Sequence, residues 1–296
     1  MRVLVTGAHG FIGHQVCMAL AKRGHDVIGA DKIRNAISPK AERAAALAKA
    51  RVKVHDLDLT DVAAAGRFMR RLQPGCIVHM AAQFPIKHTT SAVKQFVDAN
   101  VIGFLNIFEA AKAAGVGRVV YASSITASGR PGSLYGATKI FGEAAARVYG
   151  RFGIENVGLR YGVVYGPKMR TDAGIWRVLR SLLDGREIGK AQGFGSKQPL
   201  LFGDEAAEIT AEFVDAPLEA KASTYLVAAD DRTADFGDVL DEACRYLGVK
   251  PSYPEGFQTT PRGPAPDLTP LRNALGIVPR VTLEQGIGPV IEWMRA

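Results

Sequence analysis

Two hydrophobic patterns alternate along the first 160 residues. Short apolar runs are typical of buried strands, and longer stretches with apolar residues every three or four positions are typical of helices. The predicted strands are 3–5, 27–31, 52–55, 76–80, 119–122 and 157–159, and the predicted helices are 12–22, 41–49, 63–72, 93–114 and 137–149. Each connection is long enough for a crossover between parallel strands, so the pattern predicts an α/β fold of the Rossmann type with a doubly wound parallel sheet.

The pattern becomes irregular after residue 167. It still predicts helices at 175–183, 236–247 and 283–294, and a strand at 225–228. We therefore expect a dinucleotide-binding core over 1–167 and a smaller C-terminal substrate-binding lobe over 168–296, some of whose segments return to the core. Ligands of such sheets bind outside the carboxyl ends of the strands, where irregular segments would contact them.

A glycine-rich turn follows the first predicted strand. The chain begins MRVLVTGAHGFIG, which places Gly7, Gly10 and Gly13 at the spacing GxxGxxG before a helix. Glycine permits a tight turn and a close approach to a ligand, and the helix N-terminus offers free N–H groups to an anion. The motif indicates a pyrophosphate site, although by itself it also fits an ordinary turn of another α/β protein.

Asp31 ends the second predicted strand, eighteen residues after Gly13. A carboxylate there can accept a hydrogen bond from a ribose 2′-hydroxyl and would repel a 2′-phosphate, which favours NAD over NADP. Lys32 and Arg34 lie beside it and could hold that phosphate instead, so NADP stays possible. The alternative role of Asp31 is simply to end a strand or to cap the next segment.

Tyr135 and Lys139 lie four residues apart in a predicted helix, so they share one face. A free tyrosine has a pKa of ~10, and a nearby cation favours its ionised form. Ser123 and Ser124 end the preceding strand, where a hydroxyl could bind the substrate oxygen while the tyrosine exchanges its proton. In isolation the pair would more often be an exposed helical face, but its place after the fifth strand favours catalysis.

Composition excludes several classes of protein. The 296 residues are 47% hydrophobic, which is enough for a sizeable core, and the net charge of +8 is scattered, so we expect small anionic substrates rather than nucleic acid. Three separated cysteines and six histidines show no metal-ligand spacing, so we expect no metal. No 18-residue apolar run is present, so we expect a cytoplasmic protein without membrane contact.

Taken together, the motifs resemble those of extended short-chain dehydrogenases/reductases, in the NAD-dependent epimerase/dehydratase family. The matching segments are VTGAHGFIG at 5–13, Asp31, DLTD at 58–61, HMAAQ at 79–83, Asn100, YASS at 121–124, YGATK at 135–139 and RYGVVYGP at 160–167. A weaker match at 267–279 extends the resemblance over nearly the whole chain.

The resemblance implies a role for each matching position. The pyrophosphate would lie on Gly7, Gly10, Phe11, Ile12 and Gly13, the adenosine ribose on Asp31 with Lys32 beside it, the adenine on Asp58 and Leu59, and the nicotinamide near Ala81, Ala82 and Asn100. Lys139 would hold the nicotinamide ribose, Tyr135 would be the acid/base, and Ser124 its partner. Gln83, Ser124 and Arg262 are the residues expected to contact the substrate.

Departures from the family pattern narrow the range of possible reactions and substrates. Family 4,6-dehydratases carry an acidic pair where this chain has Ile125 and Thr126, so we exclude that reaction. Sugar-nucleotide epimerases often carry Asn near residue 163 and Arg near residue 198, where this chain has Val163 and Gln198. Lys190, Lys197 or Arg262 would have to replace that arginine. The stretch from 124 to 135 is also short, which predicts a smaller or more open pocket.

The leading hypothesis is NAD-dependent hydride transfer at a secondary alcohol or ketone of a sugar, a sugar-nucleotide or a related polar substrate. Epimerisation and net oxidation or reduction both remain open. The alternatives are a cofactor-binding regulatory protein without turnover and an NADP-dependent reductase of a small ketone. The resemblance also implies a homodimer that packs through the helices 93–114 and 137–149.

Overall fold

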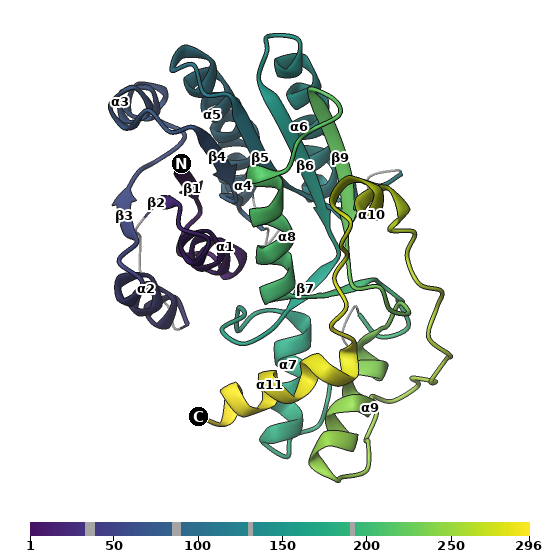
Figure 1. The fold of residues 1–296 in the computed structure, drawn as a ribbon. Helices are drawn as coiled ribbons and strands as arrows, with labels where there is room; N and C mark the ends of the chain where they lie inside the picture. Colours follow the sequence, from purple (N-terminus) through teal and green to yellow (C-terminus); the bar gives the residue numbers. More distant parts are fainter. Residues whose placement is uncertain (33–38, 85–89, 130–132, 190–192) are drawn as a thin grey trace. The chain divides into compact units, whose positions relative to one another are not determined.

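A seven-stranded sheet organises the first part of the chain, in the computed structural model that describes residues 1–32, 39–84, 90–129, 133–189 and 193–296. The strand order is β3-β2-β1-β4-β5-β6-β9 (Figure 1). Its members are β1 (Arg2–Thr6), β2 (Asp26–Asp31), β3 (Lys53–Asp56), β4 (Cys76–His79), β5 (Arg118–Ser124), β6 (Glu155–Tyr161) and β9 (Ala222–Val227). All neighbouring pairs from β3 to β6 are parallel, which confirms the predicted doubly wound sheet.

Helices cover both faces of this sheet. On one face α3 (Val62–Leu72), α5 (Gly103–Ala113) and α6 (Leu134–Gly150) contribute Phe68, Ile107 and Tyr149 to a core that includes Leu4 and Ile77 of the strands. On the other face lies α1 (Phe11–Lys22), and α2 (Lys40–Lys49) packs against it. Strand residues buried on both sides explain why the predicted strands read as continuous apolar runs.

One helix that the hydrophobic pattern did not predict joins this first unit. Helix α8 (Gly203–Asp215) lies beside α1. Two hydrogen bonds join the helices: Arg23, at the C-terminal end of α1, donates to Glu208 at 3.0 Å and to Glu212 at 2.5 Å. The chain forms two compact units: the first is 1–161 with 207–226, and the second is 162–206 with 227–296. The segment containing most of α8 and β9 therefore belongs with the first unit.

The prediction of one uninterrupted helix over 93–114 was wrong. The structure has α4 (Thr90–Val97), a π-helical turn η1 (Asp98–Ile102) and α5 in succession. A π turn inserts an extra residue into the helix, and such turns are frequent at functional sites. Here the turn contains the buried Asn100, whose side chain bonds the backbone of the loop after β4.

The second unit contains two short parallel strands, β7 (Val163–Tyr165) and β8 (Leu200–Phe202). Its helices are α7 (Gly174–Leu183), α9 (Phe236–Leu247), α10 (Thr269–Leu275) and α11 (Leu283–Arg295). The pattern predicted α7, α9 and α11 but not α10 or the two strands. Among the residues that the structure describes, no helix is long and apolar enough to span a bilayer.

Asp235 organises the start of α9 in this second unit. Its buried carboxylate accepts hydrogen bonds from the backbone N–H groups of Gly237 at 2.7 Å, Asp238 at 3.1 Å and Gly195 at 3.1 Å. It also lies 3.0 Å from the Nζ of Lys197. One side chain thus fixes both the helix start and the preceding loop.

Replacing Asp235 with alanine should lower the free energy of unfolding of the second unit by about 3 kcal/mol or more, because several buried donors lose their acceptor. Thr282→Ala, which removes the side-chain cap of α11, is the matched control and should cost about 1 kcal/mol. Both tryptophans, Trp176 and Trp293, lie in this unit, so denaturant unfolding followed by tryptophan fluorescence measures the difference. Equal losses in the two variants would contradict this role of Asp235.

Candidate active site

The residues predicted for the cofactor and for catalysis lie at the carboxyl ends of successive strands of the first unit. Gly7 directly follows β1, Asp31 ends β2, Asp58 comes two residues after β3, Ala81 two residues after β4, and Ser124 ends β5. Because these strands are parallel and adjacent, their carboxyl ends meet at one edge of the sheet. This is the edge at which ligands of doubly wound sheets bind.

Close backbone contacts explain the glycines of the first loop. Gly7 has a φ of +69°, and a Cβ there would lie 2.7 Å from the backbone nitrogen of Ala81. A Cβ on Gly13 would lie 2.0 Å from the carbonyl oxygen of Gly7, and one on Gly10 would lie 2.8 Å from the same oxygen. The loop therefore folds back onto the start of α1 and onto the loop after β4 in a way that side chains would prevent.

The N-terminus of α1 fits a dinucleotide pyrophosphate. The helix begins after Gly10 without a side-chain cap, and the first N–H groups of a helix have no partner within it. Phe11, Ile12 and Gly13 form this first turn, so their backbone amides and the helix dipole favour an anion there. An acidic side chain is absent from this first turn, which leaves the positive end of the helix uncompensated.

The surroundings of Asp31 fit the adenosine ribose that the sequence predicts there. Its Oδ2 accepts a hydrogen bond from the backbone N–H of His9 at 2.8 Å, and its Oδ1 lies 4.0 Å from Nζ of Lys40. The side-chain Nδ1 of His9 is buried and has no hydrogen-bond partner in the described part of the chain. A carboxylate next to an orphaned imidazole nitrogen suits the hydroxyl groups of a sugar.

Lys32 pairs with Asp58 rather than pointing to Asp31. The Lys32 ammonium donates to Asp58, whose other oxygen accepts from Thr60 N at 3.0 Å and Thr60 Oγ1 at 2.7 Å. Burial opposes ionisation of Asp58, but the bonds from Lys32 and Thr60 outweigh it and lower its pKa to about 2. The ammonium of Lys32 is thus already paired with a carboxylate, and Arg34 lies outside the described residues. The structure therefore offers no support for a 2′-phosphate site on these two cations.

Side chains brace the loop after β4. Asn100 accepts from Gln83 N at 2.7 Å and donates to Gln83 O at 2.8 Å, so it holds Gln83 by the backbone. Thr6 Oγ1 lies 2.8 Å from Nδ1 of His79 and accepts weakly from Ala81 N at 3.4 Å. Burial lowers the pKa of His79 to about 3, so its imidazole is neutral. Thr6 was missed by sequence reasoning, because its signal is a contact 73 residues away.

Tyr135 lies in the first turn of α6, and Lys139 lies one turn further. The Nζ of Lys139 is 5.4 Å from the centroid of the Tyr135 ring. The rings of Phe84 and Phe96 contact the phenol ring at centroid distances of 5.0 and 6.3 Å. These two phenylalanines were not predicted, and they fix the orientation of the tyrosine.

The ammonium group of Lys139 is buried against the end of the sheet. It donates to the carbonyl oxygen of Ala122 at 2.7 Å and lines a small cavity with Ala81, Ala82 and Asn100. Burial lowers the pKa of Lys139 to about 8, while the carboxylate of Glu143 opposes this shift. The structure therefore brings together the predicted lysine and three of the residues expected to line the path to the nicotinamide.

Ser124 ends β5 and begins a single turn, η2 (Ile125–Ala127). Its Oγ accepts from the backbone N–H of Thr126 at 3.2 Å and from the Thr126 hydroxyl at 2.9 Å, which leaves its own proton for donation. A Cβ on Gly136 would lie 2.7 Å from the Thr126 carbonyl oxygen. The glycine beside Tyr135 therefore lets α6 start in close contact with the turn that follows Ser124.

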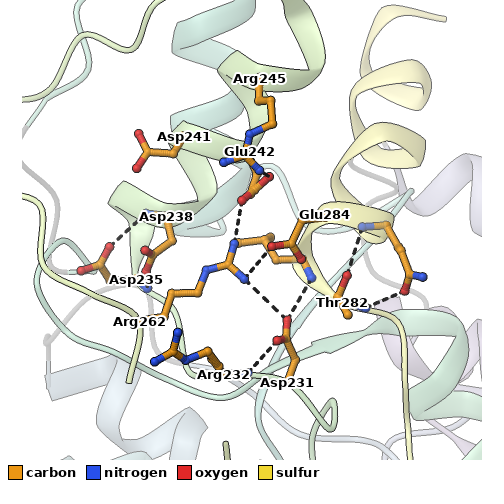
Figure 2. Close-up of polar contacts among 12 residues, drawn as sticks. Asp231, Arg232, Asp235, Asp238, Asp241, Glu242, Arg245, Arg262, Thr282 and Glu284 are labelled. Atoms are coloured by element: carbon orange, nitrogen blue, oxygen red, sulfur yellow. Dashed lines mark hydrogen bonds and ion pairs between the residues drawn. The ribbon is translucent and has the colours of Figure 1, made fainter. Parts of the chain in front are cut away.

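Arg262, expected to contact substrate, belongs to the second unit and is enclosed by acids (Figure 2). Its guanidinium lies 2.7 Å from Glu242, 2.9 Å from Glu284 and 3.7 Å from Asp231. Lys197 likewise lies 3.0 Å from Asp235 and 2.7 Å from Asp238. Both cations are thus paired with carboxylates, while Lys190 and residues 130–132 of the short segment before Tyr135 lie outside the described residues.

A family profile for the NAD-dependent epimerase/dehydratase family matches residues 3–228. The chain belongs to this family. Among curated relatives of this epimerase/dehydratase chain, UDP-glucuronate 4-epimerase 3 of Arabidopsis thaliana is 34% identical over 64% of the chain and 49% of the relative. Protein CapI of Staphylococcus aureus is 27% identical over 73% of the chain and 70% of the relative. The match thus spans about half the length of the plant relative.

Solved structures of two epimerases share the fold of this chain. The Bacillus cereus UDP-glucuronic acid 4-epimerase in complex with UDP-glucuronic acid and NAD has a TM-score of 0.86 at 22% identity, covering 100% of this chain and 99% of that one. The Thermus thermophilus UDP-glucose 4-epimerase complex with NAD has a TM-score of 0.81 at 25% identity, with the same coverage. Family membership identifies NAD as the cofactor of this epimerase/dehydratase chain, in agreement with the prediction.

Gly13→Ala should abolish NAD binding, because the added Cβ would meet the Gly7 carbonyl oxygen at 2.0 Å and displace the loop. Gly117→Ala is the matched control, since a Cβ there meets nothing within 4 Å. Isothermal titration calorimetry with NAD measures both variants, and circular dichroism checks that each is folded. NAD binding by folded Gly13→Ala with unchanged affinity would contradict the assigned loop.

Proposed function

We propose that this chain catalyses NAD-dependent hydride transfer at a secondary alcohol or ketone of a sugar-like polar substrate, with Tyr135 as acid/base. The observation that carries this proposal is the position of the Lys139 ammonium. It is buried at the edge of the sheet that holds the glycine loop, and it lies 5.4 Å from the centroid of the Tyr135 ring. Bound NAD supplies the acceptor and donor of the hydride. Perturbed ionisable groups in such a position are typical of catalysis.

Each residue has a defined task in this scheme. Tyr135 takes the proton of the substrate hydroxyl as the carbon becomes a ketone, and returns it in the reverse direction. The nearby Lys139 ammonium stabilises the phenolate form of Tyr135 by electrostatic attraction. Ser124 donates its free hydroxyl proton to the same substrate oxygen. Ile125 and Thr126 of η2 carry no carboxylate, so a dehydratase reaction lacks its acid/base pair.

Two net reactions are consistent with this chemistry. Similarity to UDP-glucuronate 4-epimerases supports epimerisation of a sugar-nucleotide through a ketone. The ion pairs of Lys197 and Arg262 favour the second candidate, a dehydrogenase of a substrate without a diphosphate, because both cations already have carboxylate partners. Gln198 in place of the family arginine supports the same alternative, since its amide offers no charge to a phosphate.

The two reactions differ in what happens to the cofactor. A panel of UDP-sugars, free sugars and hydroxy acids is added to the protein with NAD, while absorbance at the reduced-nicotinamide band is recorded. Stoichiometric reduction of added NAD by an unphosphorylated substrate indicates a dehydrogenase. Conversion of a UDP-sugar into its epimer without net absorbance change indicates an epimerase.

Tyr135→Phe should lower turnover by about 10²- to 10⁴-fold, the usual contribution of a general acid/base, and leave NAD affinity unchanged. Tyr149→Phe is the matched control, because that hydroxyl lies in the same helix but donates to Glu109 at 2.7 Å. Steady-state kinetics and calorimetry measure both properties. Unchanged turnover in Tyr135→Phe would favour the alternative of a regulatory protein that binds NAD without catalysis.

We also propose that the chain forms a homodimer through its first unit and acts in the cytoplasm. Large apolar side chains are exposed at Phe141 and Val148 of α6 and at Phe152 just after it, and Ile102 of η1 is exposed as well. Apolar exposure of this kind is typical of helices that pack against a partner. The thiols of Cys17, Cys76 and Cys244 are free, which suits a reducing compartment.

Phe141→Asp should convert the proposed dimer into a monomer, because a charge would have to be buried in an apolar contact. Val249→Asp is the control, since Val249 is also exposed but lies in the second unit. Light scattering at micromolar concentration gives the mass of each variant. A monomeric mass for the unmodified protein would overturn the dimer.

A further inference from the structure

A buried ion pair lies one helical turn beyond Lys139. Glu143 of α6 is 3% exposed, and Arg160 of β6 donates to it twice, from Nε at 2.8 Å and from Nη2 at 2.6 Å. Ser123 of β5 donates its hydroxyl to the same carboxylate at 2.6 Å. Three donors thus hold one buried carboxylate in a single position.

The same carboxylate connects the elements that carry the catalytic groups. Ser123 precedes Ser124 in β5, and Glu143 follows Lys139 by four residues in α6. Arg160 lies in β6, the strand that pairs with β5, and its register partner there is Ser123. A shift of α6 along the sheet would therefore break the bonds of Glu143 to Ser123 and Arg160.

The polar groups around Lys139 come from several elements, and most of them are uncharged. On β4, His79 is neutral, because burial lowers its pKa to about 3. On β5, burial raises the pKa of Tyr121, so this phenol is also uncharged, and Ala122 offers a carbonyl oxygen. On η1, Asn100 is an amide, and on α6 itself Tyr135 lies on one side. One turn further along α6, Glu143 adds a negative charge that opposes the lowering of the Lys139 pKa.

We propose that Glu143, clamped by Arg160 and Ser123, is a positioning residue that keeps the buried Lys139 ammonium charged and in place beside Tyr135. This inference rests on the proposed function, since it assigns the source of the charge that Tyr135 uses. Burying an ammonium favours its neutral form, and a carboxylate nearby counteracts that preference. Glu143 therefore lets the site exclude water around Lys139 without losing the cation.

Direct titration of Lys139 tests this role without any turnover. Protein labelled with ¹³C-lysine is titrated by NMR, and the Lys139 Cε resonance is assigned by its absence in Lys139→Arg. The unmodified protein should show a midpoint at about 8. In Glu143→Gln the midpoint should fall by about one pH unit, because the counter-charge is gone and the positive Arg160 remains.

The sign of the shift separates this role from a purely structural one. If Glu143 only held α6 on the sheet, its loss would admit water and raise the Lys139 midpoint toward the ordinary value of ~10.4. Glu109→Gln is the matched control: it removes another carboxylate acceptor, that of Tyr149, and should leave the Lys139 midpoint unchanged. A raised or unchanged midpoint in folded Glu143→Gln would overturn the proposal.

A second variant covers the case in which Glu143→Gln does not fold. Glu143→Asp keeps the negative charge but shortens the side chain by one methylene. The Lys139 midpoint should therefore fall by less than in Glu143→Gln. An unchanged or raised midpoint would again contradict the proposal. In the holoenzyme, the alkaline limb of the rate profile should move to lower pH in parallel. A protein with no turnover on any substrate would defeat the proposed function, yet the NMR titration would still decide the role of Glu143.

Discussion

Burial of a lysine ammonium at the carboxyl end of β5 is the constraint on which this site depends. A buried charge is unfavourable unless its hydrogen bonds and counter-charges are provided by the fold. Here the Ala122 carbonyl accepts one of its protons at 2.7 Å, and Glu143 supplies the opposing charge. Helix α6 must therefore begin close to the end of β5, which Gly136 permits by bringing its backbone against Thr126.

The cofactor side of the site is built mainly from backbone. Gly7 and Gly13 let the first loop, α1 and the loop after β4 approach to distances that a Cβ would not allow. Asn100 then holds Gln83 through both backbone groups, and the π turn places it there. Side chains thus act here chiefly as braces for main-chain groups, and the chemistry that we propose is assigned to Ser124, Tyr135 and Lys139.

Local signals in the sequence were sufficient to predict the parallel sheet and the close approach of Tyr135 and Lys139. The strands of the first unit are long apolar runs, and Tyr135 and Lys139 are related by one helical turn, so neither requires knowledge of distant contacts. Other features depend on long-range pairing. Phe96 and Tyr135 lie 39 residues apart in sequence yet touch, and the π turn at 98–102 follows from a bond to another loop. The short strands β7 and β8 stabilise each other and carry too few residues for a periodic signal.

Charge alone was also a poor guide to the partners of a side chain. The sequence shows that Arg262 is a cation in an irregular segment, which suits an anionic substrate. The structure shows three acids around it, drawn from α9, α11 and the loop before α9. No local rule predicts this arrangement, because Glu242 and Arg262 are twenty residues apart and meet only in the folded second unit.

A crystal structure of the protein with NAD and an inert substrate analogue tests the central claim most directly. The account predicts the pyrophosphate at the start of α1, the adenosine ribose on Asp31, and the reacting substrate oxygen within hydrogen-bond reach of the Tyr135 hydroxyl, with Lys139 still bonded to Ala122. A nicotinamide ring remote from Tyr135, or a Lys139 side chain turned into solvent in that complex, would contradict it.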